Sequence, residues 1–146
     1  MLTLILSALG LTAVTVIIHG TGTMAALGRA VRRRAGLTNT PGRLAVELVM
    51  SELIGMLLLL HLAEAIVWAL FLVWIGGLPD VETAMYFSLT SYTTVGYGDV
   101  LLPSRWRLLG PIEAAVGVLM LGWSTGILIA VIGATYRDLF PTPKTR

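Results

Sequence analysis

The stretch Thr93-Thr94-Val95-Gly96-Tyr97-Gly98-Asp99 decides how the rest of this 146-residue sequence is interpreted. Gly96 and Gly98 alternate with larger residues, and glycine adopts backbone angles that other L-residues resist. Glycine at alternate positions therefore allows successive carbonyl oxygens to point the same way.

The sequence around this loop has the composition of an integral membrane protein. Hydrophobic residues make up 56% of the chain and charged residues 12%, which is about half the charged fraction of a soluble domain. A helix crosses the hydrocarbon core with about 20 residues. We predict spanning helices within residues 1–35, 43–75 and 106–136, and a helix over 81–93 that is too short to span. The apolar part of the first segment ends near residue 27.

The N-terminal segment is expected to remain in the mature protein. A cleaved signal peptide would carry positive charge before its apolar core, whereas the first basic residue of this chain is Arg29. The chain has no cysteine, which excludes disulfides, thiolate metal sites and cysteine nucleophiles. Without cysteine, the sequence does not indicate the redox compartment of the protein.

Positive charge is distributed unevenly over the connections. Five arginines bracket the linker 36–42 and three basic residues follow the last helix, whereas only Arg105 and Arg107 lie in the other connection. Because cytoplasmic loops carry the excess of Lys and Arg, we predict a cytoplasmic linker and C-terminus and an external N-terminus in the cell membrane. The same charges do not indicate nucleic acid as a partner, because they lie beside membrane segments.

The short helix before the loop has clear boundaries in the sequence. Gly76-Gly77-Leu78-Pro79 breaks the preceding helix, and Asp80 is a good N-cap for a helix that begins at Val81. A segment that enters the membrane and turns back needs protein or a water-filled cavity around its backbone. Its C-terminal end carries partial negative charge, so a cation would be favoured there.

In this setting the loop resembles the selectivity filter of potassium channels, which is a TVGYG loop whose carbonyl rings replace the hydration shell of K⁺. The resemblance covers residues 43–136 and implies an all-α pore domain, 43–146, with outer helix 43–75, pore helix 81–93, filter 94–98 and inner helix 106–136. It implies four chains around an axis. The expected K⁺-binding residues are Thr94, Val95, Gly96 and Tyr97, with Gly98 completing the filter. An ordinary glycine turn is the alternative for so short a motif, and the flanking helices argue against it.

The resemblance also implies residues that support the filter: Tyr86, Phe87, Thr90, Thr93 and Asp99. Tyr86 and Phe87 stand where simple bacterial channels of this type have paired tryptophans, and they can pack around Tyr97. Thr90 stands where some of those channels have a glutamate that is hydrogen-bonded to the filter aspartate. Inactivation behaviour that depends on such a glutamate therefore does not carry over to this chain.

The resemblance further implies that the last helix lines the inner cavity and carries the gate. Gly117 and Gly122 are candidate hinges, because glycine tolerates bending of the backbone. Glycine also lets neighbouring membrane helices pack closely. Hinge and packing roles both remain open for these residues.

Two ionisable residues, His61 and Glu64, fall on one face of the second predicted helix. Such groups are costly at membrane depth and usually face protein or water. A proton sensor is one interpretation, and a pair that holds helices or subunits together is the favoured one. His19 of the first helix is placed nearer the cytoplasm than Glu64, so we do not expect these two side chains to touch.

The function predicted from these features is passive conduction of K⁺ by a homotetramer in contact with membrane lipids. No nucleophile, metal cluster or nucleotide loop indicates an enzyme, and no cofactor is expected beyond the permeant ion. No membrane segment carries the repeated arginines of a voltage sensor. A less selective cation channel and a non-conducting accessory membrane protein are the alternatives.

Overall fold

The computed structural model describes residues 1–36 and 43–139. Four helices follow one another: α1 (Leu2–Ala35), α2 (Arg43–Trp74), α3 (Val81–Tyr92) and α4 (Leu109–Leu139). The described residues contain no strand, which confirms the all-α prediction. The predicted linker, apart from Gly36, and the tail 140–146 lie outside the described residues.

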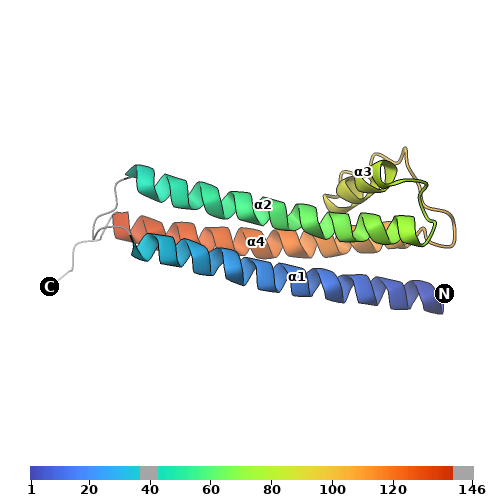
Figure 1. Cartoon of the computed structure of the whole chain (residues 1–146), viewed down its shortest axis with the longest axis horizontal. Helices are drawn as coiled ribbons and strands as arrows, with labels where there is room; N and C mark the ends of the chain where they lie inside the picture. Colours follow the sequence, from blue (N-terminus) through green and yellow to red (C-terminus); the bar gives the residue numbers. More distant parts are fainter. Residues whose placement is uncertain (37–42, 140–146) are drawn as a thin grey trace.

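Three of the helices form a long bundle. In Figure 1, α1, α2 and α4 run side by side, and α3 lies at the end of the bundle where the N-terminus is found. These three helices are long and apolar enough to cross a membrane, so the chain is a multi-pass membrane protein. The shorter α3 is tucked against α2 and α4.

Capping residues set the ends of α2 and α3. After Trp74 the chain turns at Gly76, which has φ +64°, a conformation that favours glycine. As predicted, Asp80 caps α3: its Oδ1 accepts a hydrogen bond from the N–H of Thr83 at 2.8 Å. This hydrogen bond holds the pKa of the exposed Asp80 carboxyl below its usual value.

The last helix begins three residues later than predicted. Residues 106–108 form a turn instead, in which the N–H of Trp106 donates to the carbonyl of Pro103 at 2.8 Å and that of Leu109 to the carbonyl of Trp106 at 2.9 Å. Pro111 follows as an early residue of α4, where a missing N–H costs nothing. From there α4 continues without a break past the candidate hinges, Gly117 and Gly122.

The face of α1 that packs on the bundle carries mainly small side chains. Its buried residues recur every three or four positions: Leu4, Ala8, Leu11, Thr15, His19, Thr23, Ala26 and Ala30. Gly22 lies so close to Leu60 of α2 that an added Cβ would clash with it. Because hydrophobic driving force is lost between helices in lipid, close approach of this kind is what holds them together.

All four helices meet in one buried cluster, formed by Leu11, Trp68, Tyr92, Val116 and Met120. Tyr92 is the last residue of α3, and Gly117 of α4 faces its backbone. A Cβ at Gly117 would clash with the carbonyl of Tyr92, whereas a Cβ at Gly122 would meet no atom within 4 Å. Gly117 is thus required for close packing of α3 on α4, and the hinge prediction for both glycines stays a prediction.

We predict that Gly117→Ala lowers the free energy of unfolding by about 1–3 kcal/mol, the usual cost of overpacking, because backbone has to move to make room for the methyl group. Thermal denaturation of the purified protein in detergent measures this effect. Gly10→Ala is the matched control, since Gly10 also lies within a helix but has no neighbour within 4 Å of an added Cβ. Equal stability of the two variants would contradict the packing role.

Candidate functional site

The loop that follows α3 folds back onto the last turn of the helix. The N–H of Thr94 donates to the carbonyl of Ser91 at 2.9 Å, and the N–H of Gly96 donates to the carbonyl of Thr90 at 3.0 Å. These bonds satisfy carbonyls at the C-terminal end of α3 that would otherwise lack partners. The position of the predicted filter is therefore set directly by the end of the short helix.

Within the loop, the left-handed conformation recurs at every second residue. The φ angles are +63° at Thr94, +52° at Gly96 and +79° at Gly98, whereas Val95 and Tyr97 are not in this region. Alternation of this kind allows successive carbonyls to point toward the same side. Two of the three positions were expected from glycine. Thr94 was not, because a β-branched residue with positive φ is an outlier that local sequence does not signal.

Thr94 is strained in this left-handed conformation. A strained residue persists only where the surrounding structure holds it, and such residues concentrate at functional sites. The side chain of Thr93, directly before it, donates to the carbonyl of Leu89 at 2.6 Å. The hydroxyl of Thr90 donates to the carbonyl of Phe87 at 3.0 Å. Both threonines therefore fasten their hydroxyls to α3 beneath the loop.

The two aromatic residues that the sequence paired take different positions. Tyr86 stacks on Tyr97 with ring centroids 6.4 Å apart and donates its hydroxyl proton to Oδ2 of Asp99 at 2.8 Å. This hydrogen bond raises the pKa of Tyr86 above its ordinary value. Phe87 instead is buried against Gly110 at the start of α4.

Asp99 is further fixed by the backbone, since its Oδ1 accepts from the N–H of Val100 at 3.1 Å. Arg105, in the connection before α4, lies over the ring of Trp106 at 5.4 Å from its centroid. That distance is within the range of a cation–π contact. The loop is thus held at Asp99 by the hydrogen bonds from Tyr86 and Val100, whereas the contact of Arg105 with Trp106 lies within the next connection.

A polar cluster lies behind this loop, where the helices meet. Nδ1 of His19 is 2.8 Å from Oε1 of Glu64, so the expectation that these residues do not touch is wrong. The contact follows the antiparallel register of α1 and α2, in which Thr15 bonds Trp68 at 3.0 Å and Arg29 pairs with Glu52 at 2.7 Å. The contact was missed because the register in which α1 pairs with α2 cannot be read from either segment alone.

The cluster includes two residues that the sequence did not single out. The hydroxyl of Tyr92 donates to Oε2 of Glu64 and lies 2.9 Å from Nδ1 of His61. Oγ of Ser124 in α4 lies 3.1 Å from Nε2 of His61. Tyr92 and Ser124 are common residue types for a helix, so their place in the polar cluster becomes visible only when the helices are packed together.

A family model described as an ion channel matches residues 55–134. This chain belongs to that ion channel family. The match takes in most of α2, all of α3, the loop and α4 as far as Ala134, and it does not include α1. The family is one of channels and not of enzymes. Neither the curated proteins nor the solved structures provided a match to this channel.

We predict that Tyr86→Phe shortens the time for which the channel conducts, by about fivefold, the factor that corresponds to one ordinary hydrogen bond. The variant keeps the ring that stacks on Tyr97 and removes only the hydroxyl that bonds Asp99. Currents of single channels in planar bilayers give the lifetime.

The control is the same substitution in an Asp99→Ala background, where the partner of the hydroxyl is already absent. If the hydrogen bond is responsible, Tyr86→Phe has no further effect there. Additive effects of the two substitutions would contradict this explanation.

Proposed function

We propose that this channel is a homotetramer that conducts K⁺ selectively, with residues 94–98 of each chain forming one quarter of the filter. The observation that carries the proposal is the left-handed conformation of Thr94, Gly96 and Gly98 in a TVGYG loop. Rings of backbone carbonyls can replace the hydration shell of K⁺. The oxygens of Thr94, Val95, Gly96 and Tyr97 are the proposed ligands of the ion.

Assembly around a symmetry axis is supported by what the single chain leaves uncovered. Val95 is 52% exposed and Tyr97 72%, although both belong to a loop and not to a lipid-facing helix. A hollow of about 360 Å³ lies next to the loop, between α3 and the start of α4. A neighbouring copy that packs here would cover these apolar groups and close the ring that one chain cannot make.

The direction of α3 favours a cation at the base of the filter. Its C-terminal end leads into the loop, and this end of a helix carries partial negative charge. No residue of the described loop 93–100 is basic, and Asp99 is acidic. The electrostatic environment of the loop therefore suits a permeant cation.

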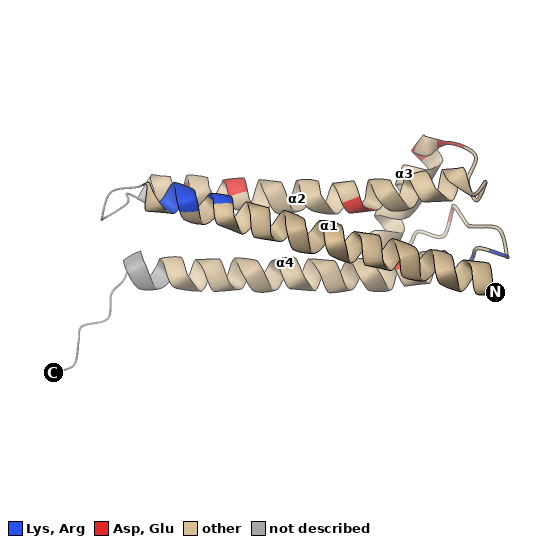
Figure 2. Ribbon diagram, turned by 60° about the horizontal axis from the view of Figure 1, so that its bottom comes forward, with Lys and Arg blue, Asp and Glu red and all other residues tan. Residues whose placement is uncertain are grey.

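The distribution of charge supports an orientation for the channel. Arg32, Arg33 and Arg34 occupy the last turn of α1, and Figure 2 shows the basic end of α1 far from α3. Because the excess of basic residues faces the cytoplasm, we infer that α3, the loop and the N-terminus lie on the outer side of the cell membrane. Basic residues at the inner end also suit contact with anionic lipid headgroups.

We further propose that the described helices do not form a voltage sensor. Moving one elementary charge through 100 mV is worth about 2.3 kcal/mol, and a sensor helix carries several such charges at membrane depth. The arginines of α1 all lie at its C-terminal end, from Arg29 onward, and from residue 44 to residue 135 the only arginines are Arg105 and Arg107 in the connection before α4. Opening is therefore proposed to depend weakly on voltage.

We expect that the purified protein in planar bilayers passes current whose reversal potential follows the K⁺ gradient when K⁺ and Na⁺ gradients oppose each other, because the filter pattern is complete. Conductance should vary only weakly over a wide range of voltage in the same recordings. A reversal potential that follows both ions would point to a less selective cation channel. A folded protein without current would point to an accessory role.

A matched pair of glycine substitutions controls for strain. Gly96 and Gly76 both have positive φ, and an added Cβ meets no atom within 4 Å at either position. Gly96→Ala should abolish selective current, whereas Gly76→Ala should preserve it, because only Gly96 lies in the filter. Equal effects of both substitutions would assign the loss to general destabilisation.

The orientation is tested with single cysteines, which the absence of native cysteine makes unambiguous. We expect a membrane-impermeant maleimide to label Ser104→Cys on intact cells and to label Gly36→Cys only after permeabilisation. Both positions are exposed in the single chain. Labelling of Gly36→Cys from outside would refute this topology.

A further inference from the structure

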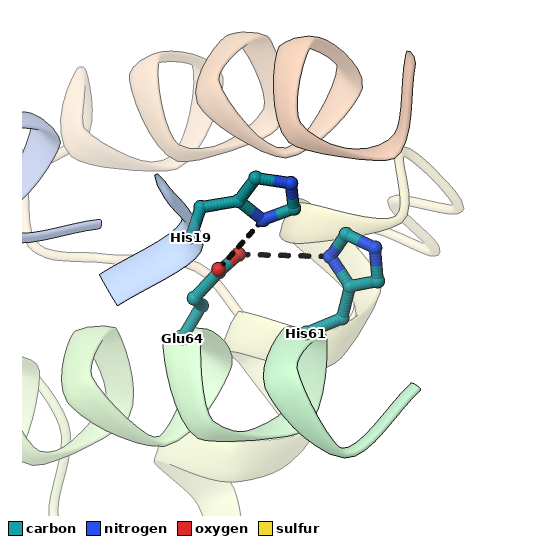
Figure 3. A group of neighbouring side chains, drawn as sticks. All are labelled: His19, His61 and Glu64. Carbon is teal, nitrogen blue, oxygen red and sulfur yellow. Dashed lines mark hydrogen bonds and ion pairs between the residues drawn. The ribbon is translucent and has the colours of Figure 1, made fainter. Parts of the chain in front are cut away.

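Both histidines of the chain lie in the polar cluster behind the filter. His19 and Glu64 are fully buried, and the side chain of His61 is 13% exposed. Figure 3 shows His19 of α1 and His61 of α2 turning a ring nitrogen toward the same carboxylate. These contacts place three groups with metal-binding atoms together at membrane depth, where an ionisable group is a functional candidate.

The distances between the three groups suit one ion. A ligand atom from each lies within 4.8 Å of the other two. Zn²⁺ in tetrahedral coordination holds imidazole nitrogens and carboxylate oxygens at about 2.0–2.2 Å, which places neighbouring ligand atoms about 3.4 Å apart. The observed separations are 2.8 Å from His19 Nδ1 to Glu64 Oε1 and 3.6 Å from His61 Nδ1 to Glu64 Oε2. These two contacts end on different oxygens of Glu64, so the side chains would have to rotate to bring one atom from each residue to this spacing.

Ser124 orients both imidazole rings. Its Oγ lies 3.1 Å from Nε2 of His61 and 3.4 Å from Nε2 of His19. A hydroxyl oxygen has two lone pairs, so it can accept one N–H from each ring. In that arrangement both Nδ1 atoms lack a proton and direct their lone pairs toward Glu64. Fixing the ring through its other nitrogen is the usual way in which a protein prepares a histidine ligand.

With two neutral imidazoles and an ionised carboxylate, the cluster has fewer protons than hydrogen-bond contacts. Neutral imidazoles supply one proton each, Ser124 and Tyr92 supply one each, and an ionised Glu64 supplies none. No arrangement of these four protons satisfies all five contacts among the rings, the two hydroxyls and the carboxylate. One additional cation, either a proton or a metal ion, satisfies the cluster.

We propose that His19, His61 and Glu64 bind one divalent transition-metal ion of the zinc type. Two imidazoles and a carboxylate are the donor set that such an ion prefers. Tyr92 holds the carboxylate through Oε2, as a second layer of hydrogen bonds usually does around metal ligands. The ion joins α1, which lies outside the matched family region, to the pore-forming part of the channel.

Metal uptake by the full-length protein tests this proposal without any measurement of current. The protein is purified with a tag free of histidine, stripped with a chelator and titrated with Co²⁺ and then Zn²⁺. One Co²⁺ per chain with the visible absorption of a tetrahedral nitrogen and oxygen site, displaced by Zn²⁺, is the expected result. Less than about one tenth of an ion per chain overturns the proposal and leaves the proton as the missing charge.

Substitutions locate the site. His19→Gln, His61→Gln and Glu64→Gln should each weaken Zn²⁺ binding by about 100-fold or more, since each removes a ligand. Glu113→Gln is the matched control, because Glu113 is also a fully buried carboxylate but belongs to α4 outside the cluster. Binding that persists in the ligand variants overturns the assignment.

A milder variant keeps the test decisive if a ligand substitution prevents folding. Ser124→Ala removes no ligand and should lower the affinity for Zn²⁺ by about 10- to 100-fold, as expected for the loss of a group that orients the ligands. The Co²⁺ spectrum reports the geometry directly, which a merely structural role of Ser124 would leave unchanged. An unaltered affinity and spectrum in this variant would overturn the role assigned to Ser124 and with it the proposed tautomers.

Discussion

The end of α3 inside the bundle is the constraint on which the rest of the structure depends. A helix that stops at membrane depth leaves carbonyl groups without partners, and lipid offers none. Here the protein supplies partners for them: the backbone N–H groups of Thr94 and Gly96 fold back onto the last turn. The same hydrogen bonds that satisfy the helix end therefore place the loop.

Tyr92 connects this helix end to each of the other helices. Its ring packs with Leu11, Trp68 and Val116, and its hydroxyl reaches Glu64. The buried hydroxyl and carboxylate satisfy each other, which removes a cost that either would incur alone. The loop is thus supported from below by apolar contacts and from within the bundle by a polar network.

Local features were the ones that the sequence predicted well. The N-cap at Asp80, the break at Gly76 and the two glycines of the loop depend on neighbours in the chain, and their residue types carry the signal. The predicted bounds of the helices differed from the observed ones by a few residues. For example, α4 begins at Leu109, because Trp106 belongs to the turn before the helix. The ion channel family agrees with the resemblance on which the fold was predicted.

Features that depend on how helices pair were missed. The contact between His19 and Glu64 requires the register of α1 on α2, which neither segment encodes by itself. Tyr92 and Ser124 have ordinary residue types for a helix, so only their meeting in space makes them part of a polar cluster. The left-handed conformation of Thr94 is imposed by the bonds around it and not by its own preference.

The close approach of Gly117 to Tyr92 has a mechanical consequence. Most helix contacts are cushioned by side chains, which can change rotamer when one helix shifts. At this point α4 touches the carbonyl of Tyr92 with no side chain of its own between them. A displacement of α4 toward α3 at this point would press directly on Tyr92, the residue before Thr93 and the loop, because no side chain of Gly117 could absorb it.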